Sequence, residues 1–295
     1  MLVGADRLTE GASAIARRFG VPEIVIGLTI VACGTSMPEF FVSLMSALNG
    51  TPDMAVGNVV GSNIMNAMLI VGCAAVVAPM VISPSTVKKD IPFSVAASAL
   101  LIVLGIDTAI GRWDGAILLV GFAIFMAYTL WQTKGTKEEQ PVESKPQSPW
   151  LSILWIILGL AGLVFGSNLF VDSASSVAAE LGVSQSVIGL TIVAGGTSLP
   201  ELATSVVAAR KGQSAIAIGN VIGSNVFNIL LILGATAVIS PLQMEGITLL
   251  DMGVMMGSIT LVWLFSFTRY TVERWEGVAL IAGYGGYLGW LLSNV

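Results

Sequence analysis

The chain has 295 residues, of which 55% are hydrophobic and only 11% are charged. A soluble domain carries about 25% charged residues, so the composition excludes a water-facing surface and indicates an integral membrane protein in a lipid bilayer. The net charge of −5, without a basic region, argues against a nucleic-acid partner. The chain lacks histidine, which excludes imidazole zinc sites and Ser-His or Cys-His nucleophiles.

Nine apolar stretches are close to the length of about 20 residues that crosses a bilayer as a helix. In chain order they cover residues 22–48, 53–78, 90–106, 113–132, 150–172, 184–210, 215–238, 248–268 and 274–293. Residues 1–20 are too polar for a full crossing and look like the tail of a helix whose beginning is missing. The pattern therefore predicts an all-α integral membrane fold with a truncated first helix.

One polar stretch, residues 133–149, is rich in Lys, Glu and Pro and has the composition of a solvated linker. It divides the chain into an N-terminal transmembrane segment, 1–132, and a C-terminal one, 150–295. A cytoplasmic linker places eleven of the 13 basic residues in the cytoplasm, as the positive-inside rule requires. These are Arg17, Arg18, Lys88, Lys89, Lys134, Lys137, Lys145, Arg210, Lys211, Arg269 and Arg274. We therefore expect a multi-pass plasma (inner) membrane protein with an extracytoplasmic C-terminus.

Two sequence blocks recur in the two segments. Residues 26–39 read IGLTIVACGTSMPE and residues 188–201 read IGLTIVAGGTSLPE, while GNVVGSNIMN at 57–66 returns as GNVIGSNVFN at 219–228. Both blocks recur at the same offset, so the segments are related by duplication. Basic residues lie at opposite helix ends in the two copies, as two segments inserted with opposite orientation require. The sequence thus predicts two inverted repeats of about five helices each.

Each repeat carries a Pro-Glu pair in the middle of an apolar span, Pro38-Glu39 and Pro200-Glu201. A carboxylate at the bilayer centre costs at least ~2.5 kcal/mol, so it must face the protein interior and have a partner. No Lys or Arg lies within the membrane part of either span, since Arg210 is the last residue of the second, which indicates that the partner is a cation from outside the chain. Two carboxylates balance one Ca²⁺ or two monovalent ions.

Oxygen-bearing residues cluster around each glutamate in the sequence. Thr35 and Thr197 stand one helical turn before the glutamates, and the prolines loosen the turns that contain Ala32 and Ala194. The second block adds Ser62, Asn63 and Asn66, with Ser224, Asn225 and Asn228 as counterparts. Hard oxygen ligands without thiolate or imidazole suit Ca²⁺, Na⁺ or Mg²⁺.

Several of these residues also have purely structural interpretations. Ser36 and Ser198 either join the site or bond the carbonyl one turn earlier, as hydroxyls in membrane helices often do. Asn58 and Asn220 are expected to bond between helices, and the GxxxG spacings of the second block to pack helices closely. As neutral amides, Asn66 and Asn228 are expected to face each other and to donate to the glutamates.

The doubled GTSxPE and GNxxGSNxxN motifs resemble the alpha repeats of the calcium/cation antiporter superfamily, the sodium/calcium exchanger family in particular. The resemblance covers nearly the whole chain and implies ten helices in two inverted groups of five, with transport by alternating access. It also implies these ion ligands: the Glu39 and Glu201 carboxylates, the Thr35, Ser62, Thr197 and Ser224 hydroxyls, the Ala32 and Ala194 carbonyls, and Asn66 and Asn228. Some exchangers carry Asp where this chain has Asn228, so this site is one acid poorer.

The resulting hypothesis is an antiporter, not an enzyme and without a cofactor, that exports Ca²⁺ in exchange for Na⁺. Ca²⁺/H⁺ exchange, with Glu39 and Glu201 alternately protonated, is the alternative. An intramembrane hydrolase lacks a nucleophile-base pair in this sequence, and a non-transporting scaffold leaves two acids unexplained.

Overall fold

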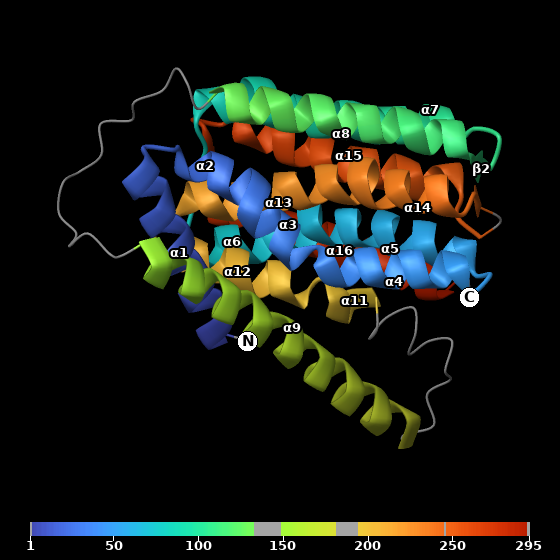
Figure 1. The fold of residues 1–295 in the computed structure, drawn as a ribbon, viewed down its shortest axis with the longest axis horizontal. Coiled ribbons are helices and arrows are strands. Elements are labelled where there is room, and N and C mark those ends of the chain that lie inside the picture. The colour runs from blue at the N-terminus through green and yellow to red at the C-terminus, as the bar shows by residue number, and fades with distance from the viewer. Residues whose placement is uncertain (1, 133–148, 181–193, 245, 294–295) are drawn as a thin grey trace.

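The computed structural model describes residues 2–132, 149–180, 194–244 and 246–293, which form a bundle of long helices (Figure 1). The first repeat contains α1 (Leu2–Phe19), α2 (Glu23–Ile26), η1 (Gly27–Val31), α3 (Ala32–Thr35), α4 (Met37–Leu48), α5 (Pro52–Met65), η2 (Asn66–Ile70), α6 (Val71–Val77), η3 (Thr86–Asp90), α7 (Ile91–Leu104) and α8 (Arg112–Gln132). The second contains α9 (Pro149–Glu180), α11 (Ala194–Thr197), α12 (Leu199–Arg210), α13 (Ser214–Val226), η5 (Phe227–Leu233), α14 (Gly234–Ile239), α15 (Leu249–Ser266) and α16 (Arg274–Ser293).

The helices agree with an all-α membrane protein. Five of them are long and apolar enough to cross a bilayer, namely Pro52–Val77, Arg112–Trp131, Pro149–Gly166, Ser214–Ile239 and Leu249–Ser266. The pair Glu23–Thr35 and Met37–Leu48, which is bent by 46° at a short break, passes the same test when the two helices are taken together. The predicted span 184–210 is described only from residue 194 onward, and the predicted linker lies outside the described residues except for its last residue. The stretch predicted over 150–172 continues as helix to Glu180.

Exposed tryptophans mark the ends of several helices. Trp113 and Trp131 lie near the two ends of α8, and Trp150, Trp275 and Trp290 lie near the ends of α9 and α16. Trp side chains favour the membrane–water interface because the indole has an apolar body and one polar N–H. Their positions fit helices that span a bilayer.

Equivalent helices of the two repeats run in opposite directions. In Figure 1 the chain passes from α2 to α4 in one direction along the bundle, and from α11 to α12 in the other. Two short antiparallel sheets join the repeats: β1 (Met80–Val81) pairs with β4 (Thr271–Val272), and β2 (Ala109–Ile110) pairs with β3 (Leu242–Gln243). Each sheet contains one strand from each repeat. The predicted inverted duplication is therefore visible in the fold.

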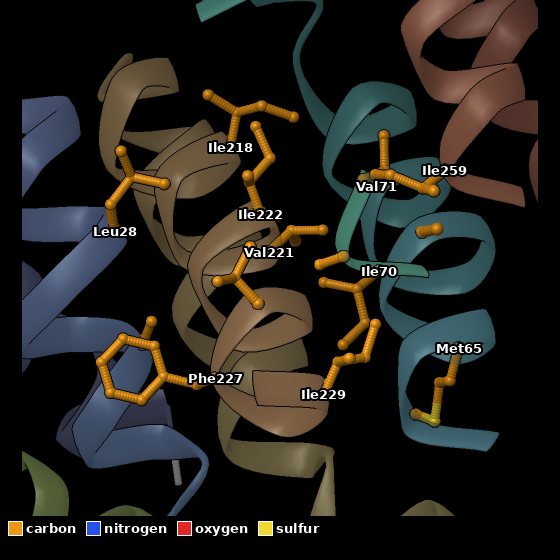
Figure 2. Packing of buried hydrophobic residues seen from close by; sticks show 14 of the residues in the cluster. Leu28, Met65, Ile70, Val71, Ile218, Val221, Ile222, Phe227, Ile229 and Ile259 are labelled. Atoms are coloured by element: carbon orange, nitrogen blue, oxygen red, sulfur yellow. The ribbon is translucent and has the colours of Figure 1, made fainter. Parts of the chain in front are cut away.

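The core lies between the helices that carry the repeated blocks. Figure 2 shows Ile218, Val221 and Ile222 of α13 lying between that helix and its neighbours, with Ile70 and Val71 from the other repeat on one side. The Gly219-x-x-x-Gly223 spacing allows this packing. A Cβ on Gly219 would lie 3.1 Å from the Cα of Gly27, and one on Gly223 would lie 2.7 Å from the Leu28 oxygen. The expectation of close helix packing is confirmed for this motif.

A second set of glycines holds the two repeats together in matching pairs. Gly72 of α6 contacts Gly277 of α16, and the equivalent pair is Gly234 of α14 with Gly115 of α8. A Cβ on Gly72 would lie 2.8 Å from the Gly277 oxygen, and one on Gly115 would lie 2.7 Å from the Gly234 oxygen. Backbone atoms cannot move aside as a flexible side chain can, so these positions require glycine.

We therefore expect Gly72→Ala and Gly115→Ala to destabilise the protein, because a single added methyl group collides with backbone. Overpacking of this kind costs about 1–3 kcal/mol. The measurement is the melting temperature of the detergent-purified protein. Gly253→Ala in α15 is the matched control, since a Cβ there meets no described atom within 4 Å and alanine favours the helix. Equal melting temperatures for all three variants would contradict the assignment.

Candidate cation site

Both glutamates lie at the start of a half-helix, directly after a break in a membrane span. Ser36 separates α3 from α4 with φ −84° and ψ 5°, and Ser198 separates α11 from α12 with φ −88° and ψ 5°. Glu39 and Glu201 occupy the first turns of α4 and α12 and are 0% and 1% exposed. Proline in the same turn fits a helix start because it needs no amide partner there. The partial positive charge of a helix N-terminus favours a carboxylate at this position.

The serines at the two breaks cross between the repeats. The Ser36 hydroxyl donates to Glu201 Oε1 at 2.9 Å, and the Ser198 hydroxyl donates to Glu39 Oε1 at 2.9 Å. Each serine lies three residues before the glutamate of its own repeat, so the two carboxylates share one interface between the repeats. Ser36 and Ser198 therefore bond to the glutamates and not to the carbonyl one turn earlier in their own helix.

Asn58 and Asn220 anchor the backbone of the glutamates. Asn58 Nδ2 donates to the Glu39 carbonyl at 3.2 Å, and Asn220 Nδ2 donates to the Glu201 carbonyl at 3.4 Å. Their Oδ1 atoms accept from the threonine of the opposite repeat, Thr35 to Asn220 at 3.1 Å and Thr197 to Asn58 at 3.4 Å. The expected interhelical bonds are confirmed, and they additionally position both glutamates.

Ser43 and Ser205, which were not predicted from the sequence, complete this support. Asn58 Nδ2 lies 3.0 Å from Ser43 Oγ, and Asn220 Nδ2 lies 2.9 Å from Ser205 Oγ. Both serines follow their glutamate by one turn of the same helix. The signal available in the sequence was their recurrence at the offset of the two blocks.

The four asparagines at the end of the second block bond across the repeats. Asn66 Nδ2 donates to Asn225 Oδ1 at 3.1 Å, and Asn228 Nδ2 donates to Asn63 Oδ1 at 2.9 Å. The expectation that Asn66 and Asn228 donate to the glutamates is therefore wrong. The crossing of the helices that carry these blocks brings each amide nitrogen to the asparagine of the other repeat instead. Asn66 begins the π-helical segment η2 and Asn228 is the second residue of η5, and such segments are frequent at functional sites.

Ser62, Ser224 and the two alanines differ in their surroundings. Ser62 Oγ lies 3.0 Å from Ser198 Oγ, so it adjoins the Glu39 carboxylate through that hydroxyl. Ser224 is buried, but its hydroxyl has no described partner. The Ala32 carbonyl accepts from the Ser36 amide at 3.0 Å at the end of α3. Ala194 begins α11, and its backbone is helical.

Eleven buried side-chain oxygens in the described part of the chain have no hydrogen-bond partner, and five of them lie on predicted site residues. These five are Glu39 Oε2, Glu201 Oε2, Asn66 Oδ1, Asn228 Oδ1 and Ser224 Oγ. Buried polar atoms are normally paired, because an unpaired one loses its hydration without compensation. All five are acceptors of the hard type that Ca²⁺ and Na⁺ bind, and four of them form matching pairs in the two repeats.

The site contains no compensating basic side chain. The ion pairs in the described part of the chain are Arg7–Glu10 at 2.8 Å and Lys211–Asp6 at 2.7 Å, and both involve α1. The stretches that the structure does not describe add basic residues only at Lys134, Lys137 and Lys145. Two carboxylates and neutral oxygens in a closed apolar interior can therefore bind one divalent cation or two monovalent cations with complete charge balance.

We expect Ca²⁺ to raise the melting temperature of the purified protein and Glu39→Gln or Glu201→Gln to remove that rise. A ligand at 100 times its dissociation constant stabilises by about 2.7 kcal/mol, and each substitution removes one of the two charges that bind it. Glu276→Gln is the matched control, because Glu276 is also buried with an unpaired Oε1 but accepts from the Glu273 amide at the start of α16. An undiminished Ca²⁺ effect in either site variant would contradict the assignment.

The geometry agrees with what comparison with known proteins finds. A family model described as sodium/calcium exchanger protein matches residues 1–131 and 151–293. The chain is 33% identical to the inner membrane protein YrbG of Escherichia coli, covering 99% of this chain and 92% of that protein. It is 32% identical to the sodium/calcium exchanger MaX1 of Methanosarcina acetivorans, covering 98% and 94%. A solved structure of the sodium-calcium exchanger NCX_Mj superposes with a TM-score of 0.86 at 33% identity, covering 98% of this chain and 94% of that one.

Proposed function

The chain belongs to the sodium/calcium exchanger protein family, and we propose that it exports Ca²⁺ in exchange for Na⁺ by alternating access. Members of this family are transporters, so the chain is a multi-pass membrane protein that exchanges cations and not an enzyme.

The proposal rests on two buried glutamates that have no basic partner and that lie among oxygens without a hydrogen-bond partner. We assign the ion ligands to the Glu39 and Glu201 carboxylates, the amide oxygens of Asn66 and Asn228, and hydroxyls and carbonyls from the same turns. The last group comprises Thr35, Ser36, Ser62, Thr197, Ser198 and Ser224 with the carbonyls of Ala32 and Ala194. Ca²⁺ takes six to eight oxygen ligands, a number that two carboxylates alone do not reach without neutral donors.

Alternating access is supported by the way in which the repeats match and differ. Most bonds around the glutamates occur twice, once in each repeat, but the Ser62–Ser198 contact has no described counterpart at Ser224. Two inverted repeats that exchange conformations open a shared site first to one side of the membrane and then to the other.

Exchange of Ca²⁺ for H⁺ is the second candidate. Each carboxylate has one oxygen that accepts a serine hydroxyl and one oxygen without a described partner. The unpaired oxygen can receive a proton as well as a metal ion, so protons could replace Na⁺ when Ca²⁺ leaves.

We place the chain in the plasma (inner) membrane with residues 133–149 in the cytoplasm as a linker and the C-terminus outside. Segments 1–132 and 150–295 then act as the two halves of the transporter. The sheet of β1 with β4 brings the loops before Lys88 and before Arg274 to one end of the bundle. The sheet of β2 with β3 brings together the loop before Arg112 and the loop that leads to Gly246. This second sheet lies at the other end of α7, because β1 precedes α7 and β2 follows it. This arrangement supports the loop charges used for the orientation.

The transport test measures ⁴⁵Ca²⁺ uptake into proteoliposomes, driven first by a Na⁺ gradient and then by a pH gradient alone. We expect uptake with the Na⁺ gradient, and none with either gradient for Glu39→Gln and Glu201→Gln, because each leaves Ca²⁺ with one uncompensated charge in low dielectric. Glu276→Gln should transport as the unmodified protein does. Uptake driven only by the pH gradient would support the second candidate, and uptake by either site variant would contradict the ligand assignment.

The orientation test uses single cysteines at positions 136 and 246 in a chain in which Cys33 and Cys73 are replaced. A membrane-impermeant thiol reagent added to intact cells should label position 246 and leave position 136 unlabelled, because the loop charges place Gly246 outside and Thr136 inside. Permeabilised cells control for reactivity, since both positions should then react. Labelling of position 136 in intact cells would reverse the topology.

A further inference from the structure

A lysine at the end of α12 binds the first helix of the chain through three acceptors. Lys211 is the C-cap residue of α12. Its Nζ lies 2.7 Å from Asp6 Oδ1 on α1, and it donates to the Asp6 carbonyl at 3.0 Å and to Thr9 Oγ1 at 3.2 Å. An ammonium group has three N–H bonds, so this lysine uses its full donor capacity on α1. Lys211 therefore ties α1 to the end of α12.

This contact joins the two repeats, in contrast to the other ion pair of the structure. Arg7 and Glu10 both belong to α1 and lie 2.8 Å apart within that helix. In the described part of the chain, Lys211–Asp6 is thus the one ion pair between the repeats. The side chains of Lys211 and Asp6 are 30% and 47% exposed, so water can replace each partner. A contact of this kind can be broken and formed again at small cost in free energy.

The equivalent positions of the other copy carry asparagine in place of both charged residues. At the offset that relates the two repeats, Asn49 corresponds to Lys211 and Asn168 corresponds to Asp6. Asn49 is the C-cap residue of α4, as Lys211 is of α12. Both asparagines are exposed. The duplication has therefore kept the positions of this contact and placed the charges in one copy.

The two pairs of helices also differ in their packing. α1 lies along α12, whereas no comparable packing of α9 against α4 is found within the described ranges. In Figure 1 the later part of α9 runs away from the bundle, while α1 lies beside α12. In the alternating access proposed above, the repeats exchange conformations, so the second state separates α1 from α12 and brings α9 to α4. The ion pair then forms in one state, and the other state has two neutral amides at the equivalent place.

We propose that Lys211 and Asp6 form a latch that favours one of the two states of the transporter, the state in which α1 packs on α12. The inference rests on the proposed alternating access and adds the residues that bias it. The loop charges place Lys211 at the cytoplasmic end of the bundle, so the latch holds α1 to α12 at that end. Because the bias comes from charge and not from packing, it can be moved to the other state by moving the charges.

The test measures the separation of α1 from the rest of the bundle by double electron–electron resonance. Spin labels are attached to cysteines at Val3 of α1 and Leu264 of α15, in a chain in which Cys33 and Cys73 are replaced. Both label positions are exposed, at 75% and 58%, so the labels do not disturb the interior. The protein is measured in proteoliposomes, and the readout is the ratio of the separation found in this structure to the separation of the second state.

We expect Lys211→Gln and Asp6→Asn each to lower this ratio about fivefold, the upper range for an exposed ion pair. The exchanged pair, Lys211→Glu with Asp6→Lys, should restore it, because it forms the same bond in the reverse direction. Arg210→Gln is the matched control and should leave the ratio unchanged. It removes the same charge from the neighbouring residue of α12, which is exposed and has no ion pair in the parts of the chain that the structure describes.

The equivalent positions provide the opposite arm. Asn49→Lys with Asn168→Asp adds an ion pair that can form when α9 meets α4, so this double variant should also lower the ratio. Combined with Lys211→Gln, it should lower the ratio further than either change alone. An unchanged ratio in Lys211→Gln and Asp6→Asn, or a single separation in every chain, would overturn the inference.

Uptake of ⁴⁵Ca²⁺ driven by a Na⁺ gradient is measured on the same variants. None of them alters a proposed ligand, so uptake should persist in all of them. Absence of uptake by the unmodified protein with either a Na⁺ or a pH gradient would overturn the proposed function. The failure of the latch and the failure of the transport proposal are therefore read from different measurements.

Discussion

The whole arrangement depends on two carboxylates that are buried in an apolar interior without a basic partner. Glu39 and Glu201 cannot be hydrated by bulk water, and the two described ion pairs leave them unneutralised. Their local surroundings partly offset the free-energy cost of burying the two charges. Each receives a hydroxyl from the other repeat and sits at a helix N-terminus. We propose that a cation from solution removes the remaining free-energy cost of burying the two carboxylates when it binds.

Because the chain is duplicated, the same arrangement of polar residues occurs once in each repeat, and the two copies form one symmetric site. Because the serine of each repeat bonds the glutamate of the other, neither repeat completes its half of the site alone. The asparagines at the end of the second block follow the same rule. The glycine pairs Gly72–Gly277 and Gly115–Gly234 bring the repeats to backbone contact, which holds these polar bridges at bonding distance. Packing and site chemistry are therefore parts of one interface.

Asparagine has two roles in this protein, and the tertiary structure separates them. In Asn58 and Asn220 both the amide nitrogen and the amide oxygen are hydrogen-bonded to neighbouring residues, so these side chains hold the glutamate backbones in place. In Asn66 and Asn228 the amide nitrogen donates to the opposite repeat, and the amide oxygen has no hydrogen-bond partner. The same type of side chain thus supports the glutamates in one position and leaves an acceptor oxygen unpaired in the other. A buried amide with a free oxygen is costly unless something binds to it.

The sequence by itself determined the membrane class, the inverted duplication and the central pair of glutamates. These follow from local quantities, namely apolar length, the side on which bases fall, and an acid without a base in an apolar span. It also identified the family through the two repeated blocks. Ten of the proposed ligands are those that the resemblance to the family implies, whereas Ser36 and Ser198 had an equally good local partner in their own helix.

Only the tertiary structure decided which hydroxyl and which amide meet which carboxylate. Ser36 bonds Glu201 rather than its own helix, and the amide of Asn66 bonds Asn225 rather than a glutamate. Side chains within one helix can be placed from the helical period, but partners across two repeats depend on how their helices cross. That crossing is fixed by backbone contacts such as the one between Gly27 and Gly219. The two glycines lie far apart in the chain, and nothing in the sequence around either one predicts the other as its contact.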